Sequence, residues 1–439
     1  MLQANVQLIE ELKGFVAYVF NNKSILHQFT HSASDFSRRR KLCFSQLVLF
    51  IIRLCKKTLS VEIEKFFDQM HSTTTCSVSA FTQQRFKLKA SFFYAWNLVL
   101  CLNFYHIFQH KIRRWRGYRV IAVDGSSVSL VNTETLRSYF GGQTNQHTFF
   151  IGARTFYLYD VLNELVVHSE IRPYRSAELN MACKAMEYLS EDTLAIYDRN
   201  FCNYKMVALH LWQERPLKFV IRAKESLHII KSFIKSGKSS SVESLLPGNA
   251  AIKGLRNSGF IITNDTALKV RLVRVDLDGT VEVLMTNLWE HEGYKACQFK
   301  DIYFMRWGIE TAIALQKNVL QMESFSGFTV HAVMQDFYAT VFMANLHSIL
   351  IKNAQQNVDQ QVHRKYPLKI NKNKSFAQLR NHLVALFIDS KPKKILEYLY
   401  QAFIKDPLPV RKGRHFKRKR KNPQSRSKYK TYTNFKPAY

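Results

Sequence analysis

Acidic residues are scarce in this chain. Its 439 residues include 33 Asp and Glu against 64 Lys and Arg, which leaves a formal net charge of +31. Solubility alone rarely requires so large an excess of positive charge. The composition therefore predicts a polyanionic partner, of which nucleic acid is the commonest.

Three further features are missing. The seven cysteines include no C-x-x-C pair, which excludes a disulfide framework and a zinc ribbon. The first residues lack the basic and then apolar pattern of a signal peptide. The most lipid-like stretch, 91–108, is interrupted by Asn97, Asn103 and His106, so we interpret it as a buried aromatic helix. We expect a cytoplasmic protein that does not enter a membrane.

The chain is rich in apolar residues: 46% of its residues are hydrophobic and 13% are aromatic, which is typical of globular domains. Residues 1–115 have helical periodicity. Within them, a helix at 59–70, a short polar break and a helix that begins after the N-cap Ser77 resemble a helix-turn-helix, with Arg85 and Lys87 as candidate DNA contacts. A plain helical hairpin fits the same pattern equally well.

Strand patterns begin near residue 118. Three strands are followed by a helix, a strand, a helix and a strand, which predicts a mixed α/β sheet. Short strands then dominate 217–297, with an Asp-Gly hairpin turn at 278–279. Helical patterns return after residue 298. We expect the following parts: a helical DNA-binding domain (1–115), a catalytic core in two pieces (116–216 and 298–350), a β-rich insertion (217–297), C-terminal helices (351–410) and a basic tail (411–439).

The tail holds twelve Lys or Arg and no acid in 29 residues. Such a segment predicts sequence-independent binding to the phosphate backbone, with Arg418, Lys419 and Arg420 among the contacts. An inert, solubilising, disordered tail is the other interpretation.

Two aspartates lie in apolar strands: Asp124 interrupts one, and Asp198 ends another. Asp124 follows "VIAV" and Asp198 follows "LAIY". A carboxylate in such a setting is costly unless it is paired, capped or bound to metal. The carboxyl ends of strands are also where α/β sheets bind their ligands. A capping or turn role remains open for either residue alone.

A third acid lies in "DIYFMRWGIETAIALQK" (301–317). If this segment is one continuous helix, Tyr303, Arg306, Glu310 and Lys317 fall within an arc of about 60°. Three converging carboxylates without His or Cys would select Mg²⁺ or Mn²⁺, and two such ions suit displacement at phosphorus. Arg306 and Lys317 would then hold DNA phosphates, and Tyr303 would contact a phosphate or a base. An exposed Arg306–Glu310 ion pair is the alternative.

These residues carry a family resemblance. Y-x2-R-x3-E-x6-K is the signature of bacterial DDE transposases of the insertion-sequence-four type, and the chain matches it at Tyr303, Arg306, Glu310 and Lys317. "AVDGS" resembles the first aspartate motif of that family. "YDRNF" resembles its second, with Asn200 in place of a glycine.

The resemblance implies a ribonuclease-H-like core in which Asp124, Asp198 and Glu310 are catalytic and hold two Mg²⁺ or Mn²⁺ ions. It implies cut-and-paste transposition: cleavage at inverted-repeat ends of double-stranded DNA, then transfer of the freed 3′-hydroxyl into target DNA, by a homodimer. Some relatives use a Trp of the insertion to steady a DNA hairpin. The nearest Trp here is Trp289, for which we predict a place in the hydrophobic core.

Two other functions stay open from the sequence. One is a metal-dependent, ribonuclease-H-like nuclease without strand transfer. The other is a DNA-binding protein derived from a transposase that has lost catalysis. The three intact acids argue against the second.

Overall fold

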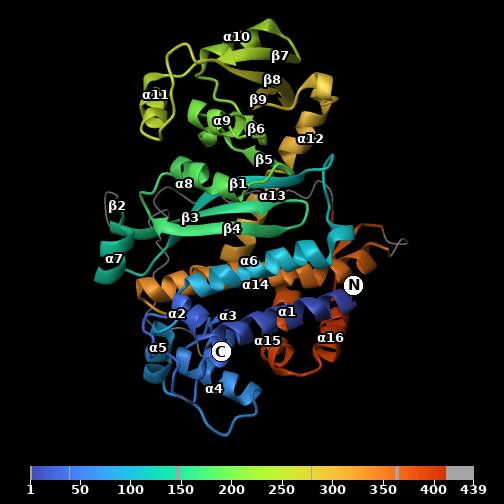
Figure 1. The fold of residues 1–439 in the computed structure, drawn as a ribbon. Coiled ribbons are helices and arrows are strands. Elements are labelled where there is room, and N and C mark those ends of the chain that lie inside the picture. The colour runs from blue at the N-terminus through green and yellow to red at the C-terminus, as the bar shows by residue number, and fades with distance from the viewer. Residues whose placement is uncertain (1, 39, 145–148, 278, 361–364, 412–439) are drawn as a thin grey trace. The chain divides into compact units, whose positions relative to one another are not determined.

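Figure 1 shows the computed structural model of the chain, which describes residues 2–38, 40–144, 149–277, 279–360 and 365–411. The chain forms two compact units, each described here by itself. The helical unit comprises Met1–Lys111, Ser129–Ile151 and Leu315–Tyr439, and the sheet unit comprises Ile112–Val128 and Gly152–Ala314.

The first strand of the sheet is central. The strand order is β2-β3-β1-β5-β6-β9-β8-β7, and β4 also pairs with β3. β5 and β6 run parallel to β1, whereas β3 and β4 form an antiparallel hairpin around Asn163. This order confirms the expected mixed α/β sheet. The strands are β1 (Arg119–Ser129), β2 (Gly142–Thr144), β3 (Phe149–Asp160), β4 (Leu165–Pro173), β5 (Thr193–Tyr197), β6 (Lys218–Arg222), β7 (Ser240–Leu245), β8 (Leu268–Leu277) and β9 (Thr280–Thr286).

Alternating side chains of the parallel strands enter two different cores. Ile121, Ala195 and Phe219 pack with α8 (Glu178–Ala185) and α9 (Tyr204–Leu211). Their neighbours Val120, Leu194 and Val220 pack on the opposite face with Phe299 and Ile302 of α12 (Phe299–Phe304). The sheet is therefore buried on both faces, as parallel strands require.

The segment between β6 and α12 builds a second set of strands onto the same sheet. β8 and β9 form a long hairpin, and β7 adds to its outer edge. Asp278 of the expected turn lies outside the described residues. Two helices accompany these strands, α10 (His228–Ser236) and α11 (Asn249–Arg256).

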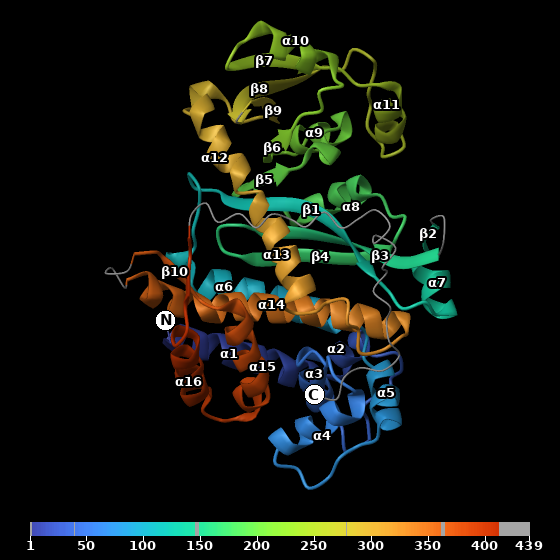
Figure 2. The ribbon, with the colours of Figure 1, turned by 180° about the vertical axis from the view of Figure 1, so that it is seen from behind.

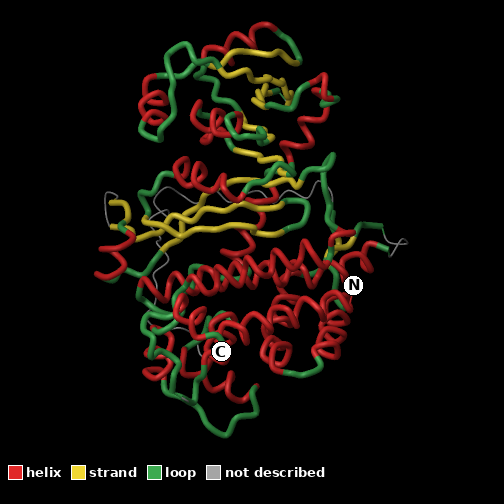
Figure 3. Tube along the Cα trace, viewed as in Figure 1, coloured by secondary structure: helices red, strands yellow, loops and turns green. Residues whose placement is uncertain are grey.

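The helical unit is built around one long helix. α14 (Val330–Asp359) begins at a Thr329 cap and is buried on nearly every side along most of its length. α6 (Ser91–Ile107) runs beside it (Figure 1). Trp96 of α6 stacks on Phe342 of α14, with ring centroids 4.2 Å apart. The other helices of this unit are α1 (Leu2–Asn21), α2 (Lys23–Phe29), α3 (Phe44–Ile52), α4 (Leu59–Gln69), α5 (Val78–Phe86), α7 (Glu134–Phe140), α15 (Lys372–Ile388) and α16 (Pro392–Ile404). Figure 3 shows helices predominating at both ends of the chain.

The aromatic stretch 91–108 is the buried helix that its sequence predicts. Asn97 is 2% exposed, and its side-chain oxygen accepts a hydrogen bond from Asn345 at 2.7 Å. Pairing of these two amides on facing helices explains why an otherwise apolar helix carries an asparagine. Within the described residues, no helix combines the length and apolar character that a membrane crossing requires.

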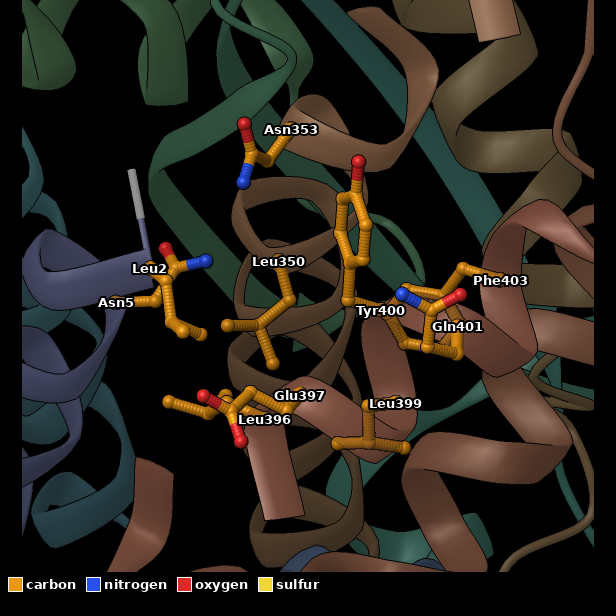
Figure 4. A pocket seen from close by; sticks show the side chains of 10 residues that line it. All are labelled: Leu2, Asn5, Leu350, Asn353, Leu396, Glu397, Leu399, Tyr400, Gln401 and Phe403. Carbon is orange, nitrogen blue, oxygen red and sulfur yellow. The ribbon is translucent and has the colours of Figure 1, made fainter. Parts of the chain in front are cut away.

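A small cavity of about 160 Å³ lies among α1, α14 and α16 (Figure 4). Its walls combine four leucines with polar side chains, among them Asn5, a buried amide whose side-chain oxygen lacks a hydrogen-bond partner. Its lining contains a single carboxylate, Glu397. This cavity therefore has the character of a gap between packed helices, and the chemistry lies elsewhere.

Candidate active site

Asp124 and Asp198 occupy matching positions on neighbouring parallel strands. Val123 of β1 pairs with Tyr197 of β5, and Tyr197 pairs with Ile221 of β6. The next residue on each strand is charged: Asp124, Asp198 and Arg222. Because side chains alternate, all three belong to the face of the sheet that α12 covers.

The side chain of Asp198 does not cap the turn that follows it, although Asp198 stands at a cap position. Its Oδ1 atom is buried and has no hydrogen-bond partner. Asp124 accepts a bond of 2.8 Å from the backbone N–H of Gly125. A capping role is thus excluded for the Asp198 side chain. In Asp124 the local turn bond involves only the Oδ1 atom of the carboxylate.

Asp124 sits among other acids. Burial raises the pKa of Asp124 to about 6, and the neighbouring carboxylates of Glu178 and Asp198 also raise it. The hydrogen bond from the Gly125 N–H and the charge of Arg306 lower this pKa but do not outweigh burial. Glu178 begins α8 and is held by Arg154, with Nη1 and Oε1 2.8 Å apart. A Cβ atom at Gly125 would lie 2.5 Å from the Glu178 carboxylate, so only glycine permits this approach. No pattern in the sequence marks Glu178 as a residue of this site.

The segment 301–317 is two helices and not one. α12 and α13 (Trp307–Asn318) are separate helices (Figure 2). α12 ends at Phe304 and α13 begins at Trp307, so Arg306 lies in the turn between them. The turn is tight, because the Arg306 N–H donates to the Tyr303 carbonyl at 3.1 Å. Gly308 then packs close to a strand turn, where a Cβ atom would lie 3.4 Å from Val161. The expectation of a continuous helix was wrong, because tertiary packing breaks it.

Arg306 contacts two other signature residues, Tyr303 and Glu310. Its Nη2 atom donates to Glu310 Oε1 at 2.8 Å, and its side chain is only 6% exposed. Burial lowers the pKa of Arg306, but Tyr303, Glu310 and Asp198 outweigh burial and raise it. The Arg306–Glu310 pair is therefore a semi-buried link toward Asp198. The alternative of a fully exposed ion pair does not describe it.

Four buried polar atoms of this site have no hydrogen-bond partner. They are Asp198 Oδ1, the Tyr303 hydroxyl, and Nε and Nη1 of Arg306. Burial raises the pKa of Tyr303 to about 12, so this hydroxyl keeps its proton and can donate. Unpaired buried polar atoms are costly and need an explanation. Three donors and one carboxylate oxygen in one place fit a phosphodiester and a cation.

A hard divalent cation fits the donor set in part. Asp124 and Asp198 offer carboxylate oxygens, one of them unpaired, on adjacent strands. Among the described residues, however, no three Asp, Glu, His or Cys side chains are grouped so as to hold a metal ion. Glu310 is turned to Arg306. The two aspartates thus lie on adjacent strands, whereas Glu310 is linked to them only through the guanidinium of Arg306.

A cavity of about 320 Å³ opens next to Asp198. It is lined by residues that follow β5 and β6, including Arg199, Arg222 and Lys224. Glu282 pairs with Arg222 across the lining. Like Asp124 and Asp198, Arg222 directly follows an apolar run, "FVI", and that signal could have identified it from the sequence.

The other predicted DNA contacts differ in how exposed they are, and some lie outside the described residues. Lys317 lies on α13, and Lys87 is a half-buried residue just after α5. Arg85 is buried at 4% exposure and pairs with Asp336 at 2.6 Å, so its charge is used inside the protein and we withdraw it as a DNA contact. Arg418, Lys419 and Arg420 lie outside the described residues.

Trp289 does not have the buried position that we predicted. It is partly exposed and stacks on His291, with the ring planes inclined by 9°. Trp289 stands at the N-cap of a short helical turn, Glu290–Glu292, which follows β9. This position after the strand leaves the ring partly exposed.

Comparisons with known proteins place these residues within a known family. The family model described as "Transposase DDE domain" matches residues 115–346. Among solved structures, a piggyBac transposase synaptic complex with hairpin DNA, determined by cryo-electron microscopy, is similar at a TM-score of 0.42 and 13% identity, over 97% of this chain and 88% of that chain. Seven chains of solved structures match. A comparison with curated proteins found no match.

Proposed function

Because the chain belongs to the transposase DDE domain family, we propose that it is a DNA transposase of the insertion-sequence-four type that cuts its element out and joins it to target DNA. The observation that carries the proposal is the group of four unpaired buried polar atoms around Asp198, Tyr303 and Arg306. We propose Asp124, Asp198 and Glu310 as the catalytic acids of this site.

The chemistry is two displacements at phosphorus. In the first, water attacks the phosphodiester at the element end, the P–O3′ bond breaks, and the leaving oxygen takes up a proton to become a 3′-hydroxyl. In the second, this hydroxyl attacks a target phosphodiester, forms a new P–O bond and releases a target 3′-hydroxyl. A divalent metal, Mg²⁺ or Mn²⁺, would activate the nucleophile and stabilise the leaving oxygen when bound.

The residues of the chain have distinct roles in this proposal. Asp124 and Asp198 would hold the metal, with Glu310 as the third ligand once it leaves Arg306. Arg306 would then turn its free donors to the phosphate oxygens. Tyr303 would donate to the same phosphate, and Lys317 would hold DNA farther along α13. We also propose a homodimer on paired element ends.

Cleavage assays on duplex DNA that carries the element ends test the proposal. We expect Mg²⁺-dependent cutting and joining by the wild-type chain, and loss of both in Asp124→Asn, Asp198→Asn and Glu310→Gln with DNA binding retained. Cutting without any joined product would favour the nuclease. A wild-type chain that binds DNA and never cuts it would favour the inactive DNA-binding protein.

The basic tail has a separate test. Removal of residues 411–439 deletes twelve cations. We expect weaker binding to all DNA and a less steep dependence on salt, by roughly 0.9 in log–log slope for each phosphate that the tail no longer neutralises. Preference for element ends should persist. Loss of that preference with an unchanged salt slope would show that the tail reads sequence and does not simply bind phosphates.

A further inference from the structure

One apolar side chain of the sheet unit is almost wholly surrounded by solvent. Ile261 is 99% exposed and belongs to the loop 257–267, which joins α11 to β8. The residues on either side of it are covered, since Phe260 is half-buried and Ile262 is 2% exposed. Single exposed apolar residues are common on protein surfaces. Ile261 is distinguished by how firmly its loop, which we call the α11–β8 loop, is held.

Contacts hold the α11–β8 loop on both sides of Ile261. On one side, the ring centroids of Phe260 and Trp212 are 5.4 Å apart. On the other side, Arg256 donates from Nε and Nη2 to the Ile262 carbonyl, at 3.0 and 2.8 Å. A side chain presented by a loop that is fixed in this way loses little conformational entropy when it enters a ligand.

A polar hollow of about 560 Å³ adjoins this loop. α11 supplies Lys253 and Arg256 to its lining, and the loop supplies the amides of Asn257 and Asn264. Lys253 is exposed and has no hydrogen-bond or ion-pair partner among the described residues. The lining also contains one acid, Asp265. Cationic and amide side chains are typical contacts of the sugar-phosphate backbone, so the hollow suits a segment of that backbone.

The surroundings of Ile261 favour DNA over a protein partner. A protein-docking surface needs a contiguous apolar patch. The exposed residues of the α11–β8 loop, however, include the polar Ser258, Thr263 and Asn264. A lone aliphatic side chain among polar and cationic groups is instead typical of proteins that push an apolar wedge between two base pairs from the minor groove. Isoleucine is one of the residues that such proteins use.

We propose that Ile261 is a wedge that opens one base step of double-stranded DNA from the minor groove and bends the duplex. Lys253 and Arg256 would hold the phosphates beside the opened step, and Asn264 would bond to the sugar or the base edges in the groove. The inference rests on the proposed function for its duplex substrate. It adds a residue of the insertion that changes the shape of that substrate.

The test uses the full chain without divalent metal, so that DNA shape is measured apart from cleavage. Two short duplexes differ by one central T·T mismatch, and each carries a fluorophore at both ends and 2-aminopurine beside the central step. A mismatch weakens stacking, so a protein that opens the step should bind the mismatched duplex more tightly. We expect the wild type to prefer this duplex by about tenfold, the factor that corresponds to the stacking of one base step. It should also shorten the end-to-end distance and raise the 2-aminopurine fluorescence.

Ile261→Ala should lose the preference, the bend and the fluorescence change. Its melting temperature should match that of the wild type, because the side chain is almost wholly exposed. Ile261→Leu keeps an aliphatic wedge and should keep all three signals. Lys253→Ala should weaken binding to both duplexes alike. Val242→Ala is the matched control, since Val242 of β7 is another exposed aliphatic residue of the sheet unit, 61% exposed, and this variant should behave as the wild type does.

The inference is overturned if the wild type binds both duplexes equally and bends neither, or if Ile261→Ala bends and unstacks DNA as the wild type does. A change of oligomeric state in Ile261→Ala, with DNA shape as in the wild-type complex, would overturn it too, because it would assign Ile261 to a protein contact. The proposed function fails differently, by absence of metal-dependent cleavage of element-end DNA in a chain that still bends duplexes.

Discussion

Single residues decide how closely the charged groups of the candidate site approach one another. Gly125 is the clearest case, because the carboxylate of Glu178 occupies the space that a side chain there would need. Glu178 is also paired with Arg154, so its carboxylate must leave this ion pair or move together with it to make room for a side chain. The glycine after Asp124, the first of the proposed catalytic acids, therefore lets the Glu178 carboxylate approach the site closely.

We predict that Gly125→Ala lowers DNA cleavage by about 10²-fold, the usual effect of displacing a reacting group by about 1 Å. Cleavage is measured on element-end DNA, and folding is checked by thermal unfolding. Gly254→Ala is the control. Gly254 lies inside α11 with open space around it, so alanine should stabilise the helix by up to about 1 kcal/mol and leave cleavage unchanged. Normal cleavage by Gly125→Ala would remove Glu178 from the account of the site.

At the scale of elements, one buried ion pair connects α5 to α14. Arg85 Nη2 and Asp336 Oδ1 are 2.6 Å apart, with side chains 5% and 9% exposed. Burial alone would raise the pKa of Asp336, but Arg85, Lys56 and the bonds from Ser326 outweigh it and lower the pKa. Asp336 is therefore charged in the folded protein and depends on Arg85.

Removing one partner should be more harmful than removing both. We predict that Arg85→Leu destabilises the protein by about 3–5 kcal/mol, because the buried Asp336 carboxylate loses the cation that is paired with it. The double change Arg85→Leu with Asp336→Leu should cost clearly less than the sum of the single changes. Urea unfolding of the four proteins of this cycle measures the coupling, and strictly additive costs would contradict the role of the pair.

At the scale of the whole molecule, each unit contains a buried, uncharged histidine. His210 lies in the sheet unit, bonded to the Tyr197 hydroxyl at 2.9 Å, and His347 lies in the helical unit, bonded to Ser375 at 2.7 Å. Burial lowers the pKa of both to about 3. In the unfolded chain these histidines take up protons near pH 6.5, so their contribution to stability is complete above that pH and is lost as the pH falls toward 3.

We therefore predict that the free energy of unfolding falls between about pH 6.5 and about pH 5, by up to about 1.4 kcal/mol per pH unit for each histidine. Denaturant unfolding across this range measures the slope. His210→Gln and His347→Gln, although less stable at neutral pH, should each show a smaller slope. His110→Gln, at an exposed position, should leave the slope unchanged. A slope that neither buried substitution reduces would contradict the prediction.

The sequence by itself determined the features that rest on local pattern. The apolar run before Asp198 predicted the end of β5, and β1 continues through Asp124 to Ser129, as expected of a strand that this acid interrupts. The order of helices and strands along the chain followed from their patterns. The Ser77 cap is also confirmed, because its side chain accepts the Ala80 N–H at 3.1 Å. These features depend on neighbours along the chain, and periodicity reports such neighbours directly.

Tertiary structure alone decided the features that depend on distant residues. Arg85 was assigned to DNA from its place on α5, yet its carboxylate partner is 251 positions away. The break between α12 and α13 follows from the burial of Arg306 and from the approach of Gly308 to Val161, neither of which is visible in a helical pattern. Glu178 joins the site for the same reason: a charged side chain has no periodic signature, and only the folded chain brings its partners within reach.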